Sequence, residues 1–90
     1  TLIAPNCIIV DSDFHAPWPP ENRRVSSTSG LDEEVSIGNN VWLGLNVVVL
    51  KGVVIGDNSI IGAGSVVANN IAANVVAVGN PAKMVKPLKQ

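Results

Sequence analysis

Residues 37–72 decide the fold, because this stretch divides without a break into six units of six residues. The units are IGNNVW (37–42), LGLNVV (43–48), VLKGVV (49–54), IGDNSI (55–60), IGAGSV (61–66) and VANNIA (67–72). The first position is always aliphatic, the second is usually Gly, and the fifth is Val, Ser or Ile. A helix would repeat its hydrophobic residues about every 3.6 positions and a half-buried strand about every two. A constant period of six therefore indicates a repeat architecture.

A six-residue period fits a chain that runs a short strand, turns, and runs another strand. Each side then points a large aliphatic residue inward, and the small residue beside it allows the turn, which Gly accepts at no steric cost. Three sides make one coil, and coils stack at roughly the 4.7–4.9 Å spacing of neighbouring strands. We expect one coil over residues 37–54 and the next over residues 55–72.

Composition narrows the possible partners. The chain has 90 residues, a net charge of −1 and one cysteine, so it is one small domain without an internal disulfide framework. Its aromatic residues are Phe14, Trp18 and Trp42, and Val and Ile must supply the core, which suits strands. The charge balance gives no indication of a nucleic-acid partner or of a membrane surface.

The residues before the main repeat contain two more units, Ile3–Ile8 and Ile9–Phe14. We interpret residues 1–14 as a partial coil, and expect the sequence to be the C-terminal part of a longer chain that associates into oligomers, because isolated small cores are marginal. Cys7 takes the inward fifth position. We interpret it as a small buried hydrophobe, since nothing nearby in the sequence would stabilise a reactive thiolate.

Two segments depart from the repeat. Residues 15–36 begin with the single histidine, His15, and contain three prolines that oppose regular strand pairing, so we predict a loop. A long loop on a compact domain is usually functional or disordered. Residues 72–79 predict a last extended side. After them, Asn80 and Pro81 predict the cap and first turn of a short C-terminal helix over residues 80–90.

The motifs VWLG (41–44), IGDNS (55–59), IGAGS (61–65) and VAVGNPAK (76–83) resemble those of hexapeptide-repeat acyltransferases. They most resemble the sugar O-acetyltransferases of the maltose, galactoside and capsular-polysaccharide type. The resemblance extends over nearly the whole chain. It implies an all-β fold, a left-handed parallel β-helix with coils over residues 37–79, although parallel crossovers are normally right-handed. It also implies acetyl-CoA as co-substrate, a sugar acceptor, a homotrimer with sites between subunits, and a cytoplasmic location.

The resemblance also assigns roles to residues. His15 follows an Ala-Pro-Asn coil and precedes the Pro- and Arg-containing loop, which is the place of the general base in this family, and imidazole titrates near neutral pH. The other implied contacts are with coenzyme A (Trp42, Ala63, Lys83, Lys86) and with the acceptor (Asn6, Arg23, Arg24). No metal ligand set is implied. Asn69 and Leu45 depart from the family pattern, in which a Lys and a Ser or Ala are frequent.

Each assigned residue has a plainer interpretation. Trp42 should face outward and could be a subunit contact instead. Residues 62–64 could be glycine-rich only for their turn, Arg23 and Arg24 could be a solvated pair, and the C-terminal lysines could be a solubilising tail.

Three other functions compete with sugar O-acetylation, because a fold does not fix a function. Serine and amino-sugar acyltransferases differ from sugar O-acetyltransferases mainly in loops. A non-catalytic β-helix subunit is the second alternative. A zinc-dependent carbonic anhydrase on this coil would need three histidine ligands, and the chain has one, so this third alternative is excluded.

Overall fold

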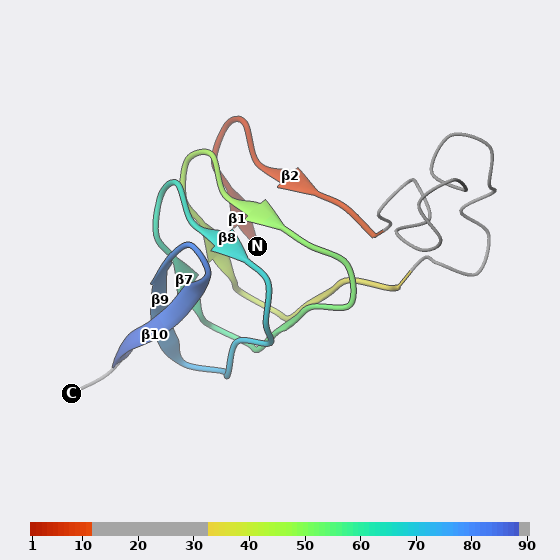
Figure 1. The fold of residues 1–90 in the computed structure, drawn as a ribbon. Coiled ribbons are helices and arrows are strands. Elements are labelled where there is room, and N and C mark those ends of the chain that lie inside the picture. The colour runs from red at the N-terminus through yellow and green to blue at the C-terminus, as the bar shows by residue number, and fades with distance from the viewer. Residues whose placement is uncertain (12–32, 89–90) are drawn as a thin grey trace, which may run out of the picture.

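The computed structural model describes residues 1–11 and 33–88, and every regular element within those ranges is a β-strand (Figure 1). In chain order the strands are β1 (Leu2–Ile3), β2 (Ile8–Ile9), β3 (Ser36–Ile37), β4 (Trp42–Leu43), β5 (Val48–Val49), β6 (Val54–Ile55), β7 (Ile60–Ile61), β8 (Val66–Val67), β9 (Val75–Gly79) and β10 (Ala82–Pro87). We name the three sheets A (β1-β4-β7-β9-β10), B (β2-β5-β8) and C (β3-β6). No helix of membrane-spanning length and hydropathy occurs among the described residues.

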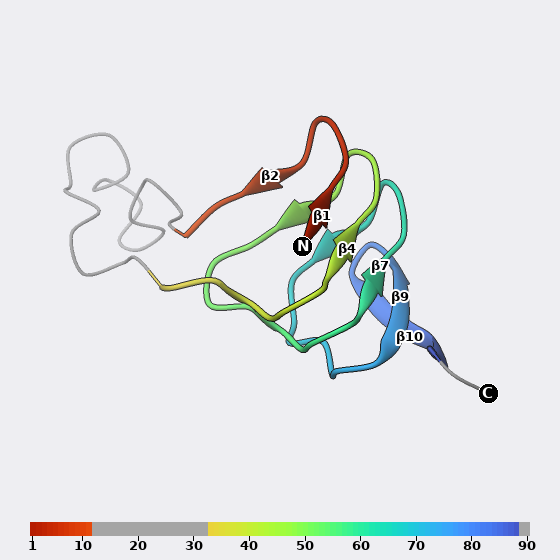
Figure 2. The same cartoon turned by 180° about the vertical axis from the view of Figure 1, so that it is seen from behind.

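The strands form a three-sided coil whose sides are the three sheets (Figures 1 and 2). Trp42 pairs in parallel with Ile60, Val48 with Val66, and Ser36 with Val54, so each partner is 18 residues further along the chain. This register confirms the predicted coil of three six-residue sides. Ser36, which the sequence had placed in the loop, already belongs to β3.

The core is built from the first and fifth positions of the repeat. Leu43, Ile55 and Ile61 at first positions and Val41 at a fifth position are at most 1% exposed. Burying one such side chain contributes roughly 1.5–3 kcal/mol. Because equivalent residues of successive coils stack directly, columns of aliphatic side chains form a core in which no aromatic residue among the described ones is buried.

The turns lie at a different position from the one predicted. The left-handed conformation occurs at the fourth position of the first five units, with φ of 58° at Asn46, 74° at Gly52 and 74° at Gly64. Asn is among the few residues that adopt it readily. The second-position glycines serve close packing instead: a Cβ on Gly44 would lie 2.8 Å from the backbone N of Ala63 in the next coil. Their role in the turn was therefore assigned wrongly.

The last coil is two residues shorter than the others. Ile71 bridges to Ile55 and Val76 pairs with Ile60, so partners here are 16 residues apart. The sequence had placed Ile71 at a fifth position. The structure puts it in the first-position column, because the corner over residues 68–70 is shorter than a standard unit.

The predicted C-terminal helix is wrong, although the last extended side, β9, is confirmed. Residues 82–87 form β10, which pairs antiparallel with β9 across a tight turn at Asn80–Pro81, whose peptide bond is cis. Asn-Pro is also a turn dipeptide. The free edge of β9 has backbone N–H and C=O groups with which a following strand can pair, whereas a helix would leave that edge unpaired. The N–H of Gly79 additionally donates to Oγ of buried Ser65 at 3.0 Å, which fixes the end of β9.

Candidate active site

Strands β1, β4, β7, β9 and β10 of sheet A lie side by side in Figure 2, and the outer face of this sheet carries two columns of residues. The strand register places the sixth positions in one column and the second positions in the other. The first column is Leu2, Trp42, Ile60, Val76 and Lys86, and the second is Ala4, Gly44, Gly62, Val78 and Lys83. Three of the four predicted coenzyme contacts therefore lie on one face of one sheet.

Trp42 is the large aromatic surface of this face. It is 51% exposed, and its strand neighbours Leu2 and Ile60 are also apolar. The prediction that Trp42 faces outward is confirmed. An indole exposed on a flat sheet provides a stacking surface and one N–H donor.

The strip beside Trp42 carries very little side-chain volume. Ala4, Gly44 and Gly62 follow one another in the second column, and Val78 comes next, with its Cγ1 against Gly62. The backbone of Ala63 packs against Gly44 at the corner where sheet A turns into sheet B, which we call the A–B corner, and Ala63 is exposed. An extended ligand can approach the backbone along such a strip.

Lys83 and Lys86 lie on β10, not on a helix, and both are exposed. Three residues apart on a regular strand, they would point to opposite faces. An irregularity between Met84 and Lys86 shifts the register, so that Lys83 pairs with Val78 and Lys86 with Val76. Because Val76 and Val78 are both outward positions of β9, the bulge puts both lysines on the face that carries Trp42.

Asn6 lies at the A–B corner, in the same column as Asn46 and Gly64. Its φ is 63°, and the carbonyl of its neighbour Pro5 accepts from the N–H of Asn46 at 3.2 Å. Asn6 and Ala63 therefore share one edge of the coil. Leu45 is 46% exposed at this corner, and its carbonyl accepts from Gly64 N–H at 2.8 Å.

His15, Arg23 and Arg24 lie outside the described residues, but both ends of their segment are defined. The N–H of Glu33 donates to the carbonyl of Asp11 at 2.7 Å, and Nζ of Lys51 lies 3.6 Å from Oε1 of Glu33. These contacts join the two ends where sheet B turns into sheet C, which we call the B–C corner. On a three-sided coil this corner lies opposite the face of sheet A (Figure 1).

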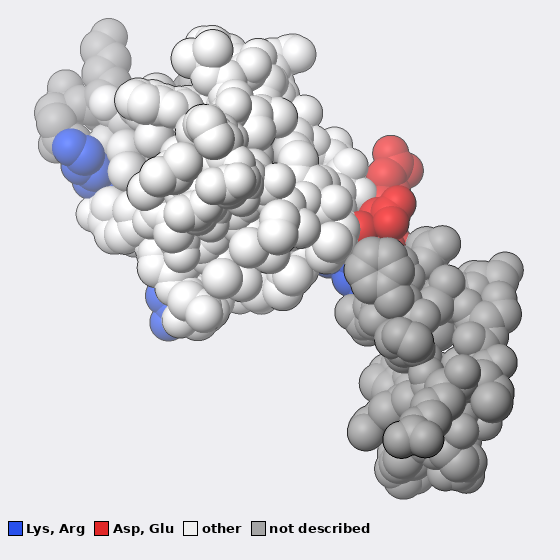
Figure 3. Space-filling model, turned by 90° about the horizontal axis from the view of Figure 1, so that it is seen from above, with Lys and Arg blue, Asp and Glu red and all other residues white. Residues whose placement is uncertain are grey.

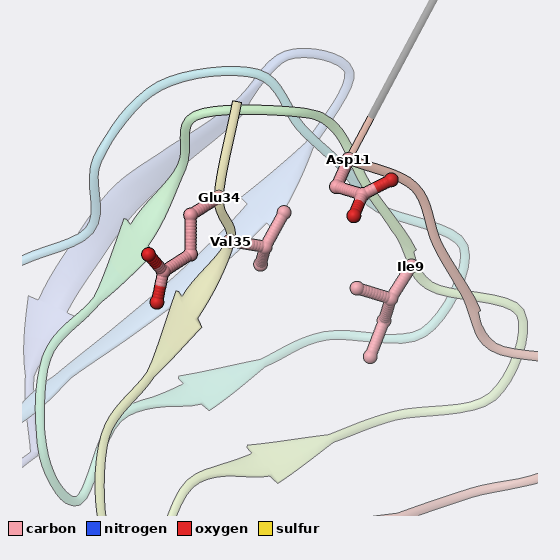
Figure 4. A pocket seen from close by; sticks show the side chains of 4 residues that line it. All are labelled: Ile9, Asp11, Glu34 and Val35. Atoms are coloured by element: carbon pink, nitrogen blue, oxygen red, sulfur yellow. The ribbon is translucent and has the colours of Figure 1, made fainter. Parts of the chain in front are cut away.

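A pocket of about 460 Å³ opens at the B–C corner, lined by Ile9, Asp11, Glu34 and Val35 (Figure 4). Two carboxylates and two aliphatic side chains line it, and the Val35 side chain lies between those of Glu34 and Asp11. Neither Asp11 nor Glu34 was among the predicted site residues. Asp11 lies within the unit Ile9–Phe14 and Glu34 within the predicted loop, so their spacing along the chain gave no signal that they line one pocket. No cluster of His, Cys, Asp and Glu arranged to hold a metal occurs within residues 1–11 and 33–88.

Comparison with known proteins shows to which family the six-residue repeat belongs. The profile of the bacterial transferase hexapeptide family (six repeats) matches residues 34–69. The galactoside O-acetyltransferase of Lactococcus lactis is 46% identical over 80 residues, which are 89% of this chain and 37% of that protein. The repeat of this chain is that of the bacterial transferase hexapeptide family.

Solved structures of the hexapeptide-repeat acetyltransferase family have the same fold. A galactoside acetyltransferase in complex with coenzyme A matches with a TM-score of 0.87 and 42% identity, over 98% of this chain and 42% of that one. A maltose O-acetyltransferase from Clostridium difficile 630 matches with a TM-score of 0.83 and 42% identity, over 98% of this chain and 45% of that one. The chain thus spans less than half the length of these relatives.

Proposed function

We propose that this chain is part of an acetyl-CoA-dependent O-acetyltransferase that acts on a hydroxyl group of a sugar or polysaccharide precursor. The observation that carries the proposal is the composition of one face: exposed Trp42, a strip almost free of side chains, and two lysines that a bulge aligns with them. Coenzyme A has an adenine ring, an extended pantetheine arm and phosphates. An indole suits a ring, a bare backbone suits the arm, and ammonium groups suit phosphates.

In the proposed reaction, His15 accepts the proton of the acceptor hydroxyl while the hydroxyl oxygen attacks the thioester carbonyl. The C–S bond then breaks, and the coenzyme A thiolate leaves and takes up a proton. No acyl-enzyme forms. Backbone N–H groups near the thioester would stabilise the oxyanion, and most of the rate gain would come from positioning. No metal has a step in this reaction.

The acceptor would lie near the segment that carries His15, Arg23 and Arg24, with Asn6 as a further contact. The pocket at the B–C corner adds two carboxylates, Asp11 and Glu34, which can accept hydrogen bonds from sugar hydroxyls. A serine or amino-sugar acyltransferase is the alternative on the same scaffold, and a non-catalytic subunit is another. The proposed donor is an intracellular metabolite, so we place the protein in the cytoplasm.

The proposed site is shared between copies of a homotrimer. In one copy, the ends of the His15 segment lie at the corner opposite the Trp42 face, whereas two neighbouring copies can bring this corner and this face together. We also infer that the coil is left-handed, as the resemblance implies. Its first turn is open: Ile3 is 53% and Ile9 43% exposed, whereas their stacked equivalents Leu43 and Val49 are fully buried.

The test is acetyl-CoA turnover by the full-length protein with a panel of sugars, followed by a thiol reagent. Wild type should release coenzyme A only when a suitable sugar is present. His15→Ala should lose turnover and still bind coenzyme A, whereas equal rates in both proteins would exclude His15 as the base. A folded wild-type protein that neither turns over nor binds coenzyme A would support the non-catalytic alternative.

The shared site has its own test. His15→Ala is expected to lose turnover and Trp42→Ala to turn over slowly when acetyl-CoA is scarce. Co-refolding the two should restore activity at that low acetyl-CoA concentration, because some mixed assemblies contain one intact site. Absence of any restoration in mixed assemblies would place the whole site within one copy.

A further inference from the structure

We propose that Ser65 is a positioning residue for coenzyme A binding, because its buried hydroxyl holds the end of β9 and thereby sets where Lys83 lies. This inference rests on the proposed function and adds the residue on which one phosphate contact depends. Ser65 is 1% exposed, and its Oγ accepts from the N–H of Gly79 at 3.0 Å. Gly79 is the last residue of β9 and pairs with Ala82, the residue before Lys83.

The two inward serines of the repeat face the irregular part of the last coil. Val occupies the fifth position of the first three units, and Ser59 and Ser65 occupy it in the next two. Oγ of Ser59 bonds to the backbone at the shortened corner, and Oγ of Ser65 accepts where β9 ends and the chain turns back into β10. A hydroxyl can accept from a backbone N–H, which a Val side chain cannot do. Ser65 therefore suits a chain that leaves the coil at this point.

The hairpin of β9 and β10 is joined to the coil at both of its ends. β10 lies at the edge of sheet A, with β9 as its neighbour (Figures 1 and 2). The hydrogen bond to Ser65 is next to the turn, and at the open end the N–H of Leu88 donates to the carbonyl of Asn74 at 2.8 Å. Lys83 lies near the first bond, whereas Lys86 lies near the second. Loss of the Ser65 hydroxyl should therefore affect Lys83 much more than Lys86.

The hydrogen bond to Ser65 restrains Gly79, which is exposed at the end of β9. Without the hydroxyl, the Gly79 N–H has no buried acceptor here and gains one from water when the strand end moves outward. Lys83 follows directly after the pair of Gly79 and Ala82, so it moves with this end. Charge-assisted hydrogen bonds require a short distance between donor and acceptor. A displaced Lys83 would therefore hold a phosphate less well.

Positive charge is scarce enough that the position of one lysine matters. Residues 1–11 and 33–88 contain three lysines and no arginine, and Lys51 lies 3.6 Å from Glu33 at the B–C corner. Figure 3 shows a described surface that is mostly uncharged in this view, with the basic side chains at a few separate places on its margin. Within the described ranges, Lys83 and Lys86 are thus the basic groups that the face of Trp42 offers to phosphates.

The experiment measures coenzyme A binding to the full-length protein by isothermal titration, with pantetheine as the second ligand. Ser65→Val and Ser65→Thr are a matched pair, because both side chains branch at Cβ and only Thr keeps the hydroxyl. Ser65→Val should weaken coenzyme A binding about threefold, the size expected for one exposed ion pair, and leave pantetheine binding unchanged. Ser65→Thr should bind both ligands like wild type. Ser65→Ala, which adds no volume to the core, replaces Ser65→Val if that variant does not fold.

A double-mutant cycle tests whether the effect passes through Lys83. In a Lys83→Gln protein, Ser65→Val should cause no further loss of coenzyme A affinity. In a Lys86→Gln protein, it should cause the same loss as in wild type. Ser59→Ala is the control for general destabilisation, because Oγ of Ser59 accepts from Val75 at the far end of β9, and it should leave the affinity unchanged.

The possible outcomes separate this inference from the proposed function. If wild type binds coenzyme A and Ser65→Val binds it equally well, Ser65 does not position the site and the proposed function stands. A parallel fall in pantetheine binding, or a full further loss in the Lys83→Gln protein, would overturn the inference in the same way. A folded wild type that binds no coenzyme A would overturn the proposed function, and with it the role of Lys83 that this inference needs.

Discussion

The backbone N–H of Val54 donates to the side-chain Oδ1 of Asn70 at 2.8 Å. In the longer coils a backbone carbonyl accepts at the equivalent place, as the carbonyl of Val53 does from Ser36 N–H at 3.0 Å. The last coil is two residues shorter, so no carbonyl reaches this N–H. Asn70 supplies the missing acceptor, and the parallel ladder continues with Ile71 N–H donating to the carbonyl of Val54 at 2.9 Å.

Asn70→Ala should lower the free energy of unfolding by about 0.5–1.5 kcal/mol, because it removes a hydrogen bond that water can only partly replace. Asn70→Asp keeps an acceptor at the same place and should remain close to wild type. Urea unfolding of the full chain, followed by circular dichroism, compares the two. Equal losses in both variants would mean that the amide group has another role.

Ser59→Ala should lower the free energy of unfolding by more than Asn70→Ala does, because Ser59 is fully buried. Its Oγ donates to the carbonyl of Ala72 and accepts from the N–H of Val75 at 3.3 Å. Removing the hydroxyl leaves both backbone groups without this partner in the core, and we expect a loss of about 1–3 kcal/mol. Val occupies the equivalent position in an earlier coil, so Ser59→Val fills the space and removes only the hydrogen bonds. If Ser59→Val were as stable as wild type or more stable, the hydroxyl would be dispensable.

Gly44→Ala should destabilise the fold, whereas Gly64→Asn should leave its stability almost unchanged. A Cβ on Gly44 meets the backbone of Ala63, which cannot move without separating two coils, so we expect a loss of about 2–3 kcal/mol. Gly64 has a φ of 74° and open space around it, and the same column holds Asn6 and Asn46. Gly64→Asn should therefore change stability by less than about 0.5 kcal/mol. Melting temperatures give the comparison, and a reversed order would refute the close-packing role.

Trp42→Ala should weaken coenzyme A binding about tenfold, corresponding to about 1.4 kcal/mol of lost contact. Stability should change little, because Trp42 is half exposed. Isothermal titration of the full-length protein measures the affinity, and Val54→Ala on sheet C is the matched surface control. If Trp42→Ala bound coenzyme A like wild type but changed the mass of the assembly, Trp42 would be a subunit contact.

Lys83→Gln and Lys86→Gln should each weaken coenzyme A binding about threefold at low salt, with the effect shrinking as salt is raised. Pantetheine has no phosphate, so neither change should alter its binding. Titrating both ligands into the same proteins separates charge from packing. If pantetheine binding fell in parallel with coenzyme A binding, the lysines would not be phosphate contacts.

The repeat made much of the fold predictable. Inward positions such as Leu43 and Ile55 and the outward position of Trp42 follow from a six-residue period, because each side of a coil must bury the same positions. The period alone did not predict the C-terminal hairpin. Asn80-Pro81 is compatible with a helix start and with a turn, and only the unpaired edge of β9 distinguishes them.

The sequence by itself determined the coil, its core columns and its family, because these depend on local spacing that repeats along the chain. Tertiary structure alone decided which distant residues share a surface. The bulge on β10 puts Lys83 and Lys86 on the face of Trp42, and the three-sided closure sets that face opposite the corner where Asp11 and Glu33 meet. Both relationships depend on strand register and on the number of sides, which residue spacing along the chain does not contain.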